Sequence, residues 1–520
     1  MDDDGDFVIV WTSYDQDGSG SGIYAQRYNG NGIPQGSEFR VNSTTMGRQD
    51  NPAIAMDADG DFVITWDSYG QDGDLYGIYA QRYNASGSPQ GSEFRVNSHT
   101  TGSQAVPAIG MDADGDFVIT WQSYGQDGSV MGIYSQRYNA SGVPQGSEFR
   151  VNSYTTSHQY PSTVGMDDFG NFIIAWSSYE QDGSGMGTYA QRYNASGTPQ
   201  GSEFRVNSYT TGNQWVPNIG VDTDGDFVIS WVSDGQDGSG EGIYAQRYNA
   251  SGVTLGGEFR VNTHTADHQR GVWIGIDSVG NFAITWISDG QDGSGFGVYA
   301  QRYYASGIPQ GGEFQVNSHT TNNQLVSIIG MDADGDFVIA WTSDGQDGSG
   351  NGVYARRYVV HQNDAPRMAT GLFPRLPDWW RKAKTNPGDT VENVIHSVSP
   401  EVLITDLNTE ALQGFCVMDA TNLNGTWQYS LDAGMTWNSL ANSSSSSARL
   451  LDPSAKLRFV PYKKKFRGDV GLTVTAWDQT TGSDGDQVDA TTRGGTTAFS
   501  SDSTEVRLTV LKKKPKKRNQ

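Results

Sequence analysis

The chain has 520 residues, which is enough for about three domains of ordinary size. Its formal net charge is −24, and it contains 66 glycines, 14 tryptophans, 25 tyrosines and 20 phenylalanines. This composition favours many short strands joined by tight turns, and it excludes helical bundles and disorder. The sequence has no run of 18 apolar residues, which excludes a membrane-spanning helix. The single cysteine, Cys416, excludes an intramolecular disulfide.

The acidic character is unevenly distributed along the chain. Residues 1–360 contain no lysine, whereas all the lysines and a nearly balanced charge lie in residues 361–520. Such a change of composition predicts a domain boundary near residue 360. A strongly acidic first part repels nucleic acid and anionic membranes, so we expect neither nucleic acid nor membrane insertion.

An internal repeat of 55 residues organises the first part. One tryptophan marks each repeat, at Trp11, Trp66, Trp121, Trp176, Trp231, Trp286 and Trp341. In the third repeat, alternating apolar runs predict four strands over 106–111, 117–124, 133–138 and 148–152. The sequence therefore predicts an all-β fold whose residues 1–360 form a seven-bladed β-propeller.

The first and last repeats are expected to be incomplete. The chain begins at the second strand of its first repeat and leaves the repeat after the third strand of its seventh, near Tyr358. Two explanations stay open: truncation of a longer array, or a blade with three strands. Truncation is favoured, since it also explains why the first residues lack the features of a signal peptide.

Beyond residue 360 the repeat ends and the composition changes. We expect a linker over 361–389, a cadherin/Ig-like β-sandwich over 390–511 and a disordered basic tail over 512–520. Residues 430–437 match an Asp-box, S-x-D-x-G-x-T-W, which we expect to stabilise a hairpin.

An Asp-x-Asp-Gly-Asp loop follows the first predicted strand of most repeats. Alternate carboxylates around a turn are suited to calcium, but the same pattern also makes a hairpin turn, with Asp accepting backbone N–H bonds and Gly supplying positive φ. The fourth and sixth repeats keep the first Asp and the Gly but lose the middle Asp, which favours the turn. The candidate calcium ligands are Asp57, Asp59, Asp61, Asp112, Asp114, Asp116, Asp222, Asp224, Asp226, Asp332, Asp334 and Asp336.

A second acidic loop, Gln-Asp-Gly, follows the second predicted strand of every repeat. Propeller topology places this loop on the same rim as the segment after the fourth strand, so the rim is a candidate binding surface for a cation or a carbohydrate. The alternative is that Asp-Gly is simply a good loop dipeptide. The candidate rim residues are Asp72, Asp127, Asp182, Asp237, Asp292, Asp347, His99, His264 and His319.

Motifs for catalysis are missing from the sequence. We find no G-x-S-x-G, HExxH, cysteine pair or phosphate loop, so no catalytic residue is assigned and no enzyme is expected. Glycoside hydrolysis by a pair of carboxylates stays open as an alternative, because acids are plentiful and a sequence does not show the distances between them.

Two resemblances extend this interpretation. The 55-residue unit, with D-x-x-G-[DN]-F, QDG, YAQRYN and EFRVN, resembles repeats of large secreted or surface proteins of bacteria. Residues 361–511 resemble the cadherin-like modules of the same proteins, through Asn363–Pro366, Ile404–Asn408, Gly425–Ser430 and Ala476–Asp478. That resemblance implies calcium-dependent adhesion outside the cell, with Asp364, Glu392, Asp406 and Asn408 as candidate ligands.

The function expected first is therefore a non-enzymatic extracellular adhesion protein. It would be stabilised by calcium and present the propeller to a protein or carbohydrate on a cell surface or matrix, with its signal peptide missing from this chain. Two alternatives stay open: a carbohydrate-binding or carbohydrate-active propeller, and a structural spacer of a larger surface protein.

Overall fold

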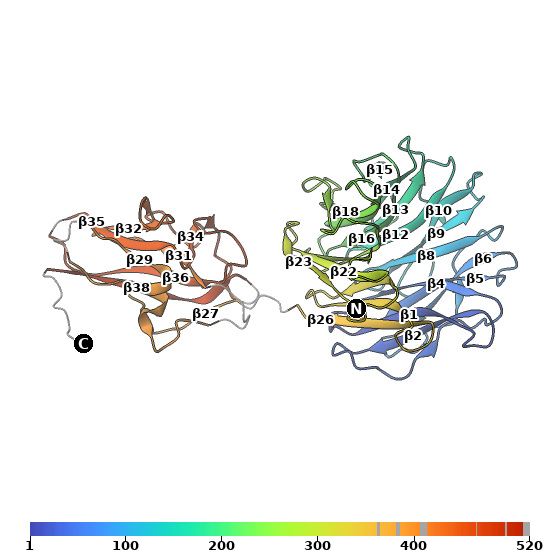
Figure 1. The fold of residues 1–520 in the computed structure, drawn as a ribbon, viewed down its shortest axis with the longest axis horizontal. Helices are drawn as coiled ribbons and strands as arrows, with labels where there is room; N and C mark the ends of the chain where they lie inside the picture. The colour runs from blue at the N-terminus through green and yellow to red at the C-terminus, as the bar shows by residue number, and fades with distance from the viewer. Residues whose placement is uncertain (361–364, 381–384, 406–412, 464, 495–496, 513–520) are drawn as a thin grey trace. The chain divides into compact units, whose positions relative to one another are not determined.

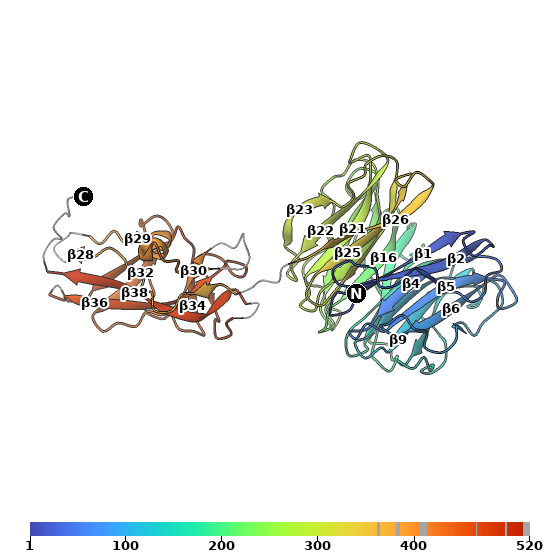
Figure 2. The same cartoon turned by 90° about the horizontal axis from the view of Figure 1, so that it is seen from below.

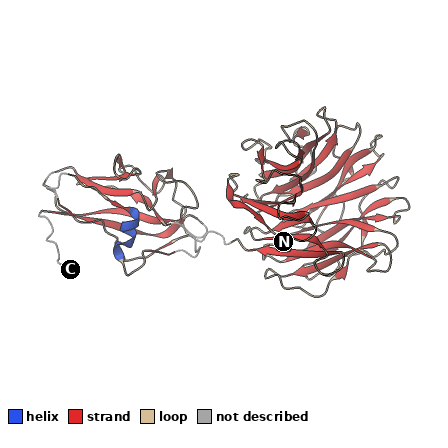
Figure 3. Cartoon of the chain, in the orientation of Figure 1, coloured by secondary structure: helices blue, strands red, loops and turns tan. Residues whose placement is uncertain are grey.

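The computed structural model describes residues 1–360, 365–380, 385–405, 413–463, 465–494 and 497–512. The chain divides into two compact units, Met1–Val360 and His361–Gln520, which we call the first and second units. Strands make up nearly all the regular structure, as predicted (Figure 3). Among the described residues, no helix has the length and apolar character needed to cross a membrane.

The first unit is a series of antiparallel sheets, one for each repeat, that follow one another in chain order (Figures 1 and 2). Five sheets have four strands, while the first and the last have three. In each complete sheet the strands also lie in chain order, which is the arrangement of β-propeller blades. We call the first strand of each sheet, from the second sheet to the seventh, the inner strand.

The first four sheets contain β1 (Phe7–Tyr14), β2 (Ser21–Tyr28), β3 (Phe39–Arg40); β4 (Gln49–Met56), β5 (Phe62–Tyr69), β6 (Tyr76–Tyr83), β7 (Phe94–Arg95); β8 (Gln104–Met111), β9 (Phe117–Tyr124), β10 (Met131–Tyr138), β11 (Phe149–Arg150); and β12 (Gln159–Met166), β13 (Phe172–Tyr179), β14 (Met186–Tyr193), β15 (Phe204–Arg205). The last three contain β16 (Gln214–Val221), β17 (Phe227–Asp234), β18 (Glu241–Tyr248), β19 (Phe259–Arg260); β20 (Gln269–Ile276), β21 (Phe282–Asp289), β22 (Phe296–Tyr303), β23 (Pro309–Gln315); and β24 (Gln324–Met331), β25 (Phe337–Asp344), β26 (Asn351–Tyr358).

The core of the first unit lies between consecutive sheets. Side chains alternate along each strand, so that Ile64 and Trp66 of β5 pack against the first sheet while Val63 packs against the third. Six apolar clusters of this kind join the sheets pairwise from the first to the seventh. Each fully buried isoleucine stabilises the fold by roughly 1.5–3 kcal/mol.

Polar side chains of each repeat also reach into both neighbouring repeats. Arg137 Nη1 donates to the Ser196 carbonyl at 2.7 Å. The carboxylate of Glu148 accepts from the Ser98 backbone N–H at 2.6 Å and from Gln126 Nε2 at 2.6 Å. These bonds recur around the unit because the residues recur, and they fix the spacing between sheets.

Most inner strands carry a bulge that sets their register. In β8 the pairing with β9 shifts between Ala105 and Ala108, and Val106 there has φ +54°. The equivalent Val326 has φ +51°, and in β20 the position is filled by Gly271 at φ +60°. A left-handed conformation is costly for a β-branched residue, so these valines carry backbone strain.

The second unit contains two larger sheets that share one apolar core. One has six strands, β28 (Trp379–Trp380), β38 (Phe499–Leu511), β36 (Gly468–Trp477), β31 (Gly414–Asp419), β34 (Ala448–Leu451) and β37 (Gln487–Val488). The other has four, β29 (Asp389–Thr390), β35 (Lys456–Pro461), β32 (Gly425–Ser430) and β33 (Asn438–Ser439). A small pair, β27 (Arg367–Met368) and β30 (Ile404–Thr405), and two short helices, α1 (Val391–Ile395) and the 3₁₀ turn η1 (His396–Val398), complete it.

The expected linker over 361–389 is wrong as a description of this segment. Its strands β27 and β28 pair with β30 and β38, and its Met368 and Leu376 are buried in the core of the second unit. The polar and proline-rich composition suggested a linker, but isolated apolar residues at these positions are enough to hold the segment against the sheets.

The predicted Asp-box forms a hairpin. The Ser430 hydroxyl donates to Asp432 at 2.7 Å, and Asp432 accepts from the Thr436 hydroxyl at 2.6 Å. These hydrogen bonds lower the pKa of the Asp432 carboxyl to about 2. Trp437 donates to the Gly434 carbonyl at 2.9 Å and lies under the Arg458 guanidinium.

Candidate functional site

Two faces of the first unit carry the candidate residues. The Asp turns join the first and second strands of the repeats, and we call the end of the first unit that carries these turns the turn face. The Gln-Asp-Gly loops join the second and third strands, and we call the opposite end the loop face. The turn 57–61 precedes β5 and the loop 70–75 follows it, so the two sets of acids are separated by the length of a strand.

On the turn face the carboxylates hold the backbone of the turn. Asp57 Oδ1 accepts from the backbone N–H groups of Asp59 and Asp61 at 3.1 and 2.8 Å, while Gly60 has φ +86°. Asp61 Oδ1 in turn accepts from the Ala85 N–H at 2.8 Å. The first and third acids of the motif are therefore bound to main-chain donors, which is the arrangement of a hairpin turn.

These turns are packed closely enough to perturb the titration of their first acid. Burial, the largest cause, raises the pKa values of Asp112, Asp222 and Asp332 to about 6. The neighbouring acids of the same turns raise these pKa values further. Backbone hydrogen bonds to the carboxylates act in the opposite direction.

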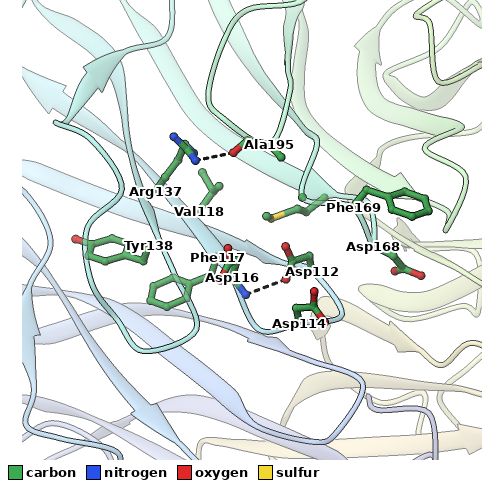
Figure 4. Close-up of a pocket in the computed structure, with 12 residues that line it drawn as sticks. Asp112, Asp114, Asp116, Phe117, Val118, Arg137, Tyr138, Asp168, Phe169 and Ala195 are labelled. Atoms are coloured by element: carbon green, nitrogen blue, oxygen red, sulfur yellow. Dashed lines mark hydrogen bonds between the residues drawn. The ribbon is translucent and has the colours of Figure 1, made fainter.

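A pocket of about 320 Å³ lies on the turn face between the third and fourth sheets. Figure 4 shows the residues that line it. It is lined by Asp112, Asp114, Asp168 and Phe169, with Arg137 at one side. Phe169 takes the place of the usual middle Asp and is 69% exposed. The pocket thus combines carboxylates with one exposed ring, but Arg137 and Asp112 already bind backbone groups there.

The geometry of the turn face does not fit a calcium site. Among the described residues, no three His, Cys, Asp or Glu side chains are grouped so as to hold one metal ion. The oxygens of the first and third acids accept main-chain hydrogen bonds instead. Of the ligands implied for the second unit, Glu392 is exposed in α1, whereas Asp364, Asp406 and Asn408 lie outside the described residues. The predicted ligands of the turn face are thus not grouped as a metal site in the described residues, and the ligands implied for the second unit stay untested.

The loop face brings the predicted rim residues into neighbouring segments. Asp127 Oδ1 accepts from the Ser129 N–H at 2.9 Å, as the equivalent acids do in other loops. Asp74 of the second loop accepts from the Gly102 N–H at 2.9 Å, which ties the loop to the segment before β8. His99 lies in that segment and is half-buried, with its carbonyl accepting from Asn97.

Exposed tyrosines on the loop face were missed by our sequence analysis. They are the last residues of β1, β5, β9 and β13. Their exposed fractions are 69% for Tyr14, 47% for Tyr69, 52% for Tyr124 and 36% for Tyr179. In the last three repeats the same position is Asp234, Asp289 and Asp344. We call the four rings the tyrosine arc. Aligning the repeats column by column would have revealed this change from Tyr to Asp.

The arc is embedded in polar surroundings. Tyr69 meets Tyr76 edge-on, with ring centroids 5.2 Å apart, and Asp74 lies in the loop between them. A Cβ at Gly102 would lie 3.3 Å from Tyr124 Cδ1, so the glycine lets the preceding segment pass close to that ring. Each of the four rings is followed in the sequence by a loop that contains carboxylates.

A second departure from the repeat lies on the same face. Glu241, at the start of β18, is 7% exposed and pairs with Arg270 and with His268 Nδ1, the latter at 3.1 Å. The equivalent residues of neighbouring repeats, Met186 and Phe296, are uncharged. This carboxylate is neutralised by its own partners and is therefore a structural ion pair rather than a free acid.

Comparisons with known proteins bear on the fold. No protein-family model and no curated protein sequence matches the chain. Among solved structures, the Penicillium chrysogenum alpha-L-arabinanase complexed with arabinobiose has a TM-score of 0.41 and 12% identity, covering 60% of this chain and 93% of that one. The Hadza microbial sialidase Hz136 has a TM-score of 0.38 and 10% identity, with coverages of 65% and 73%. The β-propeller domain of the Trilobed protease from Pyrococcus furiosus has a TM-score of 0.40 and 9% identity, with coverages of 68% and 91%.

These comparisons correct the function that we expected first. The similar solved structures are mostly carbohydrate-active enzymes by name, including two arabinofuranosidase structures from Fusarium graminearum, so the adhesion function expected first is withdrawn, while TM-scores of 0.38–0.41 assign no function to this chain. The adhesion interpretation came from the resemblance of residues 361–511 to cadherin-like modules, and no family model supports that resemblance. At identities of 9–12% the likeness bears on the fold, so the case for carbohydrate rests on this chain's own residues.

Proposed function

We propose that the first unit binds carbohydrate on its loop face, through the tyrosine arc. The observation that carries this proposal is the exposure of four tyrosine rings at one position of four successive repeats. A tyrosine offers an apolar ring to the C–H face of a sugar and a hydroxyl to its polar groups. Exposed rings repeated at one position indicate a binding surface more specifically than scattered apolar residues do.

The acids beside the arc select among carbohydrates. Asp72 and Asp74 stand in the loop that follows Tyr69, where carboxylates accept hydrogen bonds from sugar hydroxyls. The chain carries a net charge of −24, which disfavours the approach of anionic glycans. We therefore expect neutral sugars to bind and sialylated or uronic-acid-rich sugars to bind weakly.

We also propose that this surface binds sugar without hydrolysing it. The Gln-Asp-Gly acids recur in every repeat and cap their own loops, and the buried carboxylates of Glu241 and Asp67 are each held by partners within the protein. Incubation of the full chain with each glycan it binds tests this point, because a rise in reducing ends above the level of buffer would contradict it.

The binding experiment uses the full chain on a panel of neutral and anionic glycans that includes arabinobiose. We expect Tyr69→Ala and Tyr124→Ala each to weaken binding of the selected glycan by about tenfold, since one stacked ring is worth roughly 1–2 kcal/mol. Phe169→Ala is the matched control, because it removes an exposed ring from the opposite face. Equal binding by all three variants, or loss only with Phe169→Ala, would sink the assignment to the tyrosine arc.

Three finer assignments accompany this function as proposals. The sheets of the first unit form a seven-bladed propeller, the second unit is a cadherin-like β-sandwich, and the protein acts outside the cell. Support comes from the seven repeats, from the shared core of the two sheets around Trp427 and Val474, and from the acidic exterior.

A further inference from the structure

One end of the second unit brings together three segments that are far apart in the chain. The Tyr462 N–H donates to the Asn424 carbonyl at 2.9 Å, and the Thr426 hydroxyl donates to the Tyr462 hydroxyl at 2.8 Å, so the loop before β32 lies against the loop after β35. Gly468, which begins β36, pairs with Val510 near the end of β38. We call this surface the basic tip, and it consists of residues 421–426, 461–463, 465–468 and 509–512.

The basic tip carries positive charges without acidic partners. Its exposed cations are Lys463, Lys465, Arg467 and Lys512. None of the four forms an ion pair within the described part of the chain. The acids in and beside the tip, Asp469 and Asp419, already accept hydrogen bonds, from the Thr509 hydroxyl at 2.6 Å and from the Thr421 N–H at 2.7 Å. Four unpaired cations therefore share one surface of a protein whose net charge is −24.

Two large side chains with apolar surface are exposed beside these cations. Leu423, in the loop before β32, is 94% exposed, and Tyr462, which directly precedes Lys463, is 68% exposed. A single exposed leucine is common on protein surfaces, but here it is hydrogen-bonded through its neighbour Asn424 to the loop that carries most of the cations. Cations beside exposed apolar side chains are the combination that suits a negatively charged lipid surface, since the charges attract the headgroups and the apolar groups enter the interface.

We propose that the basic tip docks on the surface of a membrane that contains anionic phospholipid. The four cations bind the headgroup phosphates, while Leu423 and Tyr462 enter the boundary between headgroups and acyl chains. A soluble polyanion uses only the cations and leaves Leu423 in water, so the exposure of this leucine favours the lipid surface. The inference does not rest on carbohydrate binding, because the tip and the tyrosine arc belong to different units.

The acidity of the chain does not oppose this docking. The acidic repeats, which led us to expect no membrane insertion, lie in residues 1–360, whereas the tip lies in the second unit. Salt screens exposed charges over about 8 Å at physiological ionic strength, so the attraction is set by the charges that reach the lipid surface. Docking at the interface also needs no membrane-spanning segment.

The experiment is cosedimentation of the full chain with vesicles of equal parts phosphatidylcholine and phosphatidylglycerol. We expect binding to these vesicles and at least about tenfold weaker binding to phosphatidylcholine alone. Raising the salt from about 0.1 M to about 1 M should weaken binding by a similar factor, because it shortens the range of the attraction. Free glycerol phosphate at the phosphate concentration of the vesicles should not compete, since it offers no interface for Leu423.

Variants of the tip separate its two contributions. Lys463→Gln combined with Lys465→Gln should weaken vesicle binding about thirtyfold, which corresponds to about 1 kcal/mol for each lysine near an anionic surface. Leu423→Ser leaves the charge unchanged and should weaken binding about tenfold, because it removes the group that enters the interface. Both changes affect exposed side chains, so the melting temperature of the second unit should stay the same.

Two matched controls lie near the other end of β38. Arg367→Gln removes an exposed cation from β27, and Val402→Ser removes an exposed apolar side chain just before β30, the partner strand of β27. The Met368 N–H of β27 donates to Ser500 Oγ at 3.0 Å, which places this strand pair beside the start of β38. Both controls should bind vesicles as the natural protein does.

Several results would overturn the proposal. They are no binding to the mixed vesicles, equal binding to both kinds of vesicle, unchanged binding of Leu423→Ser, and losses in the controls as large as those in the tip variants. Competition by glycerol phosphate would assign the cations to a free phosphate compound. Tighter binding to dextran sulfate than to vesicles, insensitive to Leu423→Ser, would assign them to a soluble polyanion.

Discussion

The most informative perturbation is removal of the buried charge of Asp67 in β5. Its side chain is 1% exposed, and its Oδ2 accepts from Asn51 Nδ2 at 2.9 Å and from the Val106 N–H at 3.0 Å. Burial is the largest cause of a pKa raised from 3.8 to about 6, and the two hydrogen bonds offset it in part. At about 1.4 kcal/mol per pKa unit, the ionised carboxylate costs the folded state about 3 kcal/mol.

The sign of the pH dependence follows from the raised pKa. Below pH 3.8 the group is protonated in both states and has no effect on stability. Between pH 3.8 and about 6 the unfolded chain ionises first, so stability is lost as pH rises, and above pH 6 the loss is complete. Asp67→Asn keeps an oxygen acceptor for both donors and cannot ionise, so it should stabilise the first unit by up to about 3 kcal/mol at pH 7 and leave it unchanged near pH 3.

Differential scanning calorimetry of both proteins from pH 3 to pH 8 measures this difference on the transition of the first unit. Asp15→Asn is the control, because Asp15 is an exposed acid of the first repeat and asparagine tolerates its left-handed backbone, so the substitution should leave the curve nearly unchanged. A variant that is no more stable than the natural protein at pH 7, or a stability difference that does not change between pH 3 and pH 7, would refute the reasoning.

Four further outcomes are expected. Val326→Gly should raise the melting temperature by relieving about 1 kcal/mol of left-handed strain, measured by calorimetry. Gly115→Ala should lower stability more than Gly128→Ala in urea unfolding, because both have positive φ but only the first added Cβ meets a carboxylate, at 3.0 Å. Thr436→Val should raise the pKa of Asp432 from about 2 towards its ordinary value in an NMR titration, because it removes the hydroxyl bond that lowers that pKa most. Calcium added against EDTA should leave the melting temperature of the first unit unchanged, since its turn carboxylates already accept main-chain hydrogen bonds.

Much of the first unit could be predicted from its sequence because the determinants are local and repeated. The spacing of Trp66 and Trp121 gave the period, alternation along 117–124 predicted β9 at its observed ends, and Asp with Gly three positions later predicted the turns. The Asp-box hairpin at 430–437 was predictable for the same reason, since its hydrogen bonds join residues two and four apart. Even the change from Tyr to Asp across the tyrosine arc is present in the sequence.

The tertiary structure decided what depends on residues far apart in the chain. Asp67 is perturbed by Val106 of the next sheet, and segment 361–389 belongs to the second unit because its Met368 and Leu376 enter a core built mainly from later strands. The first and last repeats also meet in space, with Gly5 beside Asp332, although more than 300 residues separate them. Periodicity specifies which face of a strand is apolar, whereas burial and pKa depend on which neighbour lies against that face, and only the packed structure supplies the neighbour.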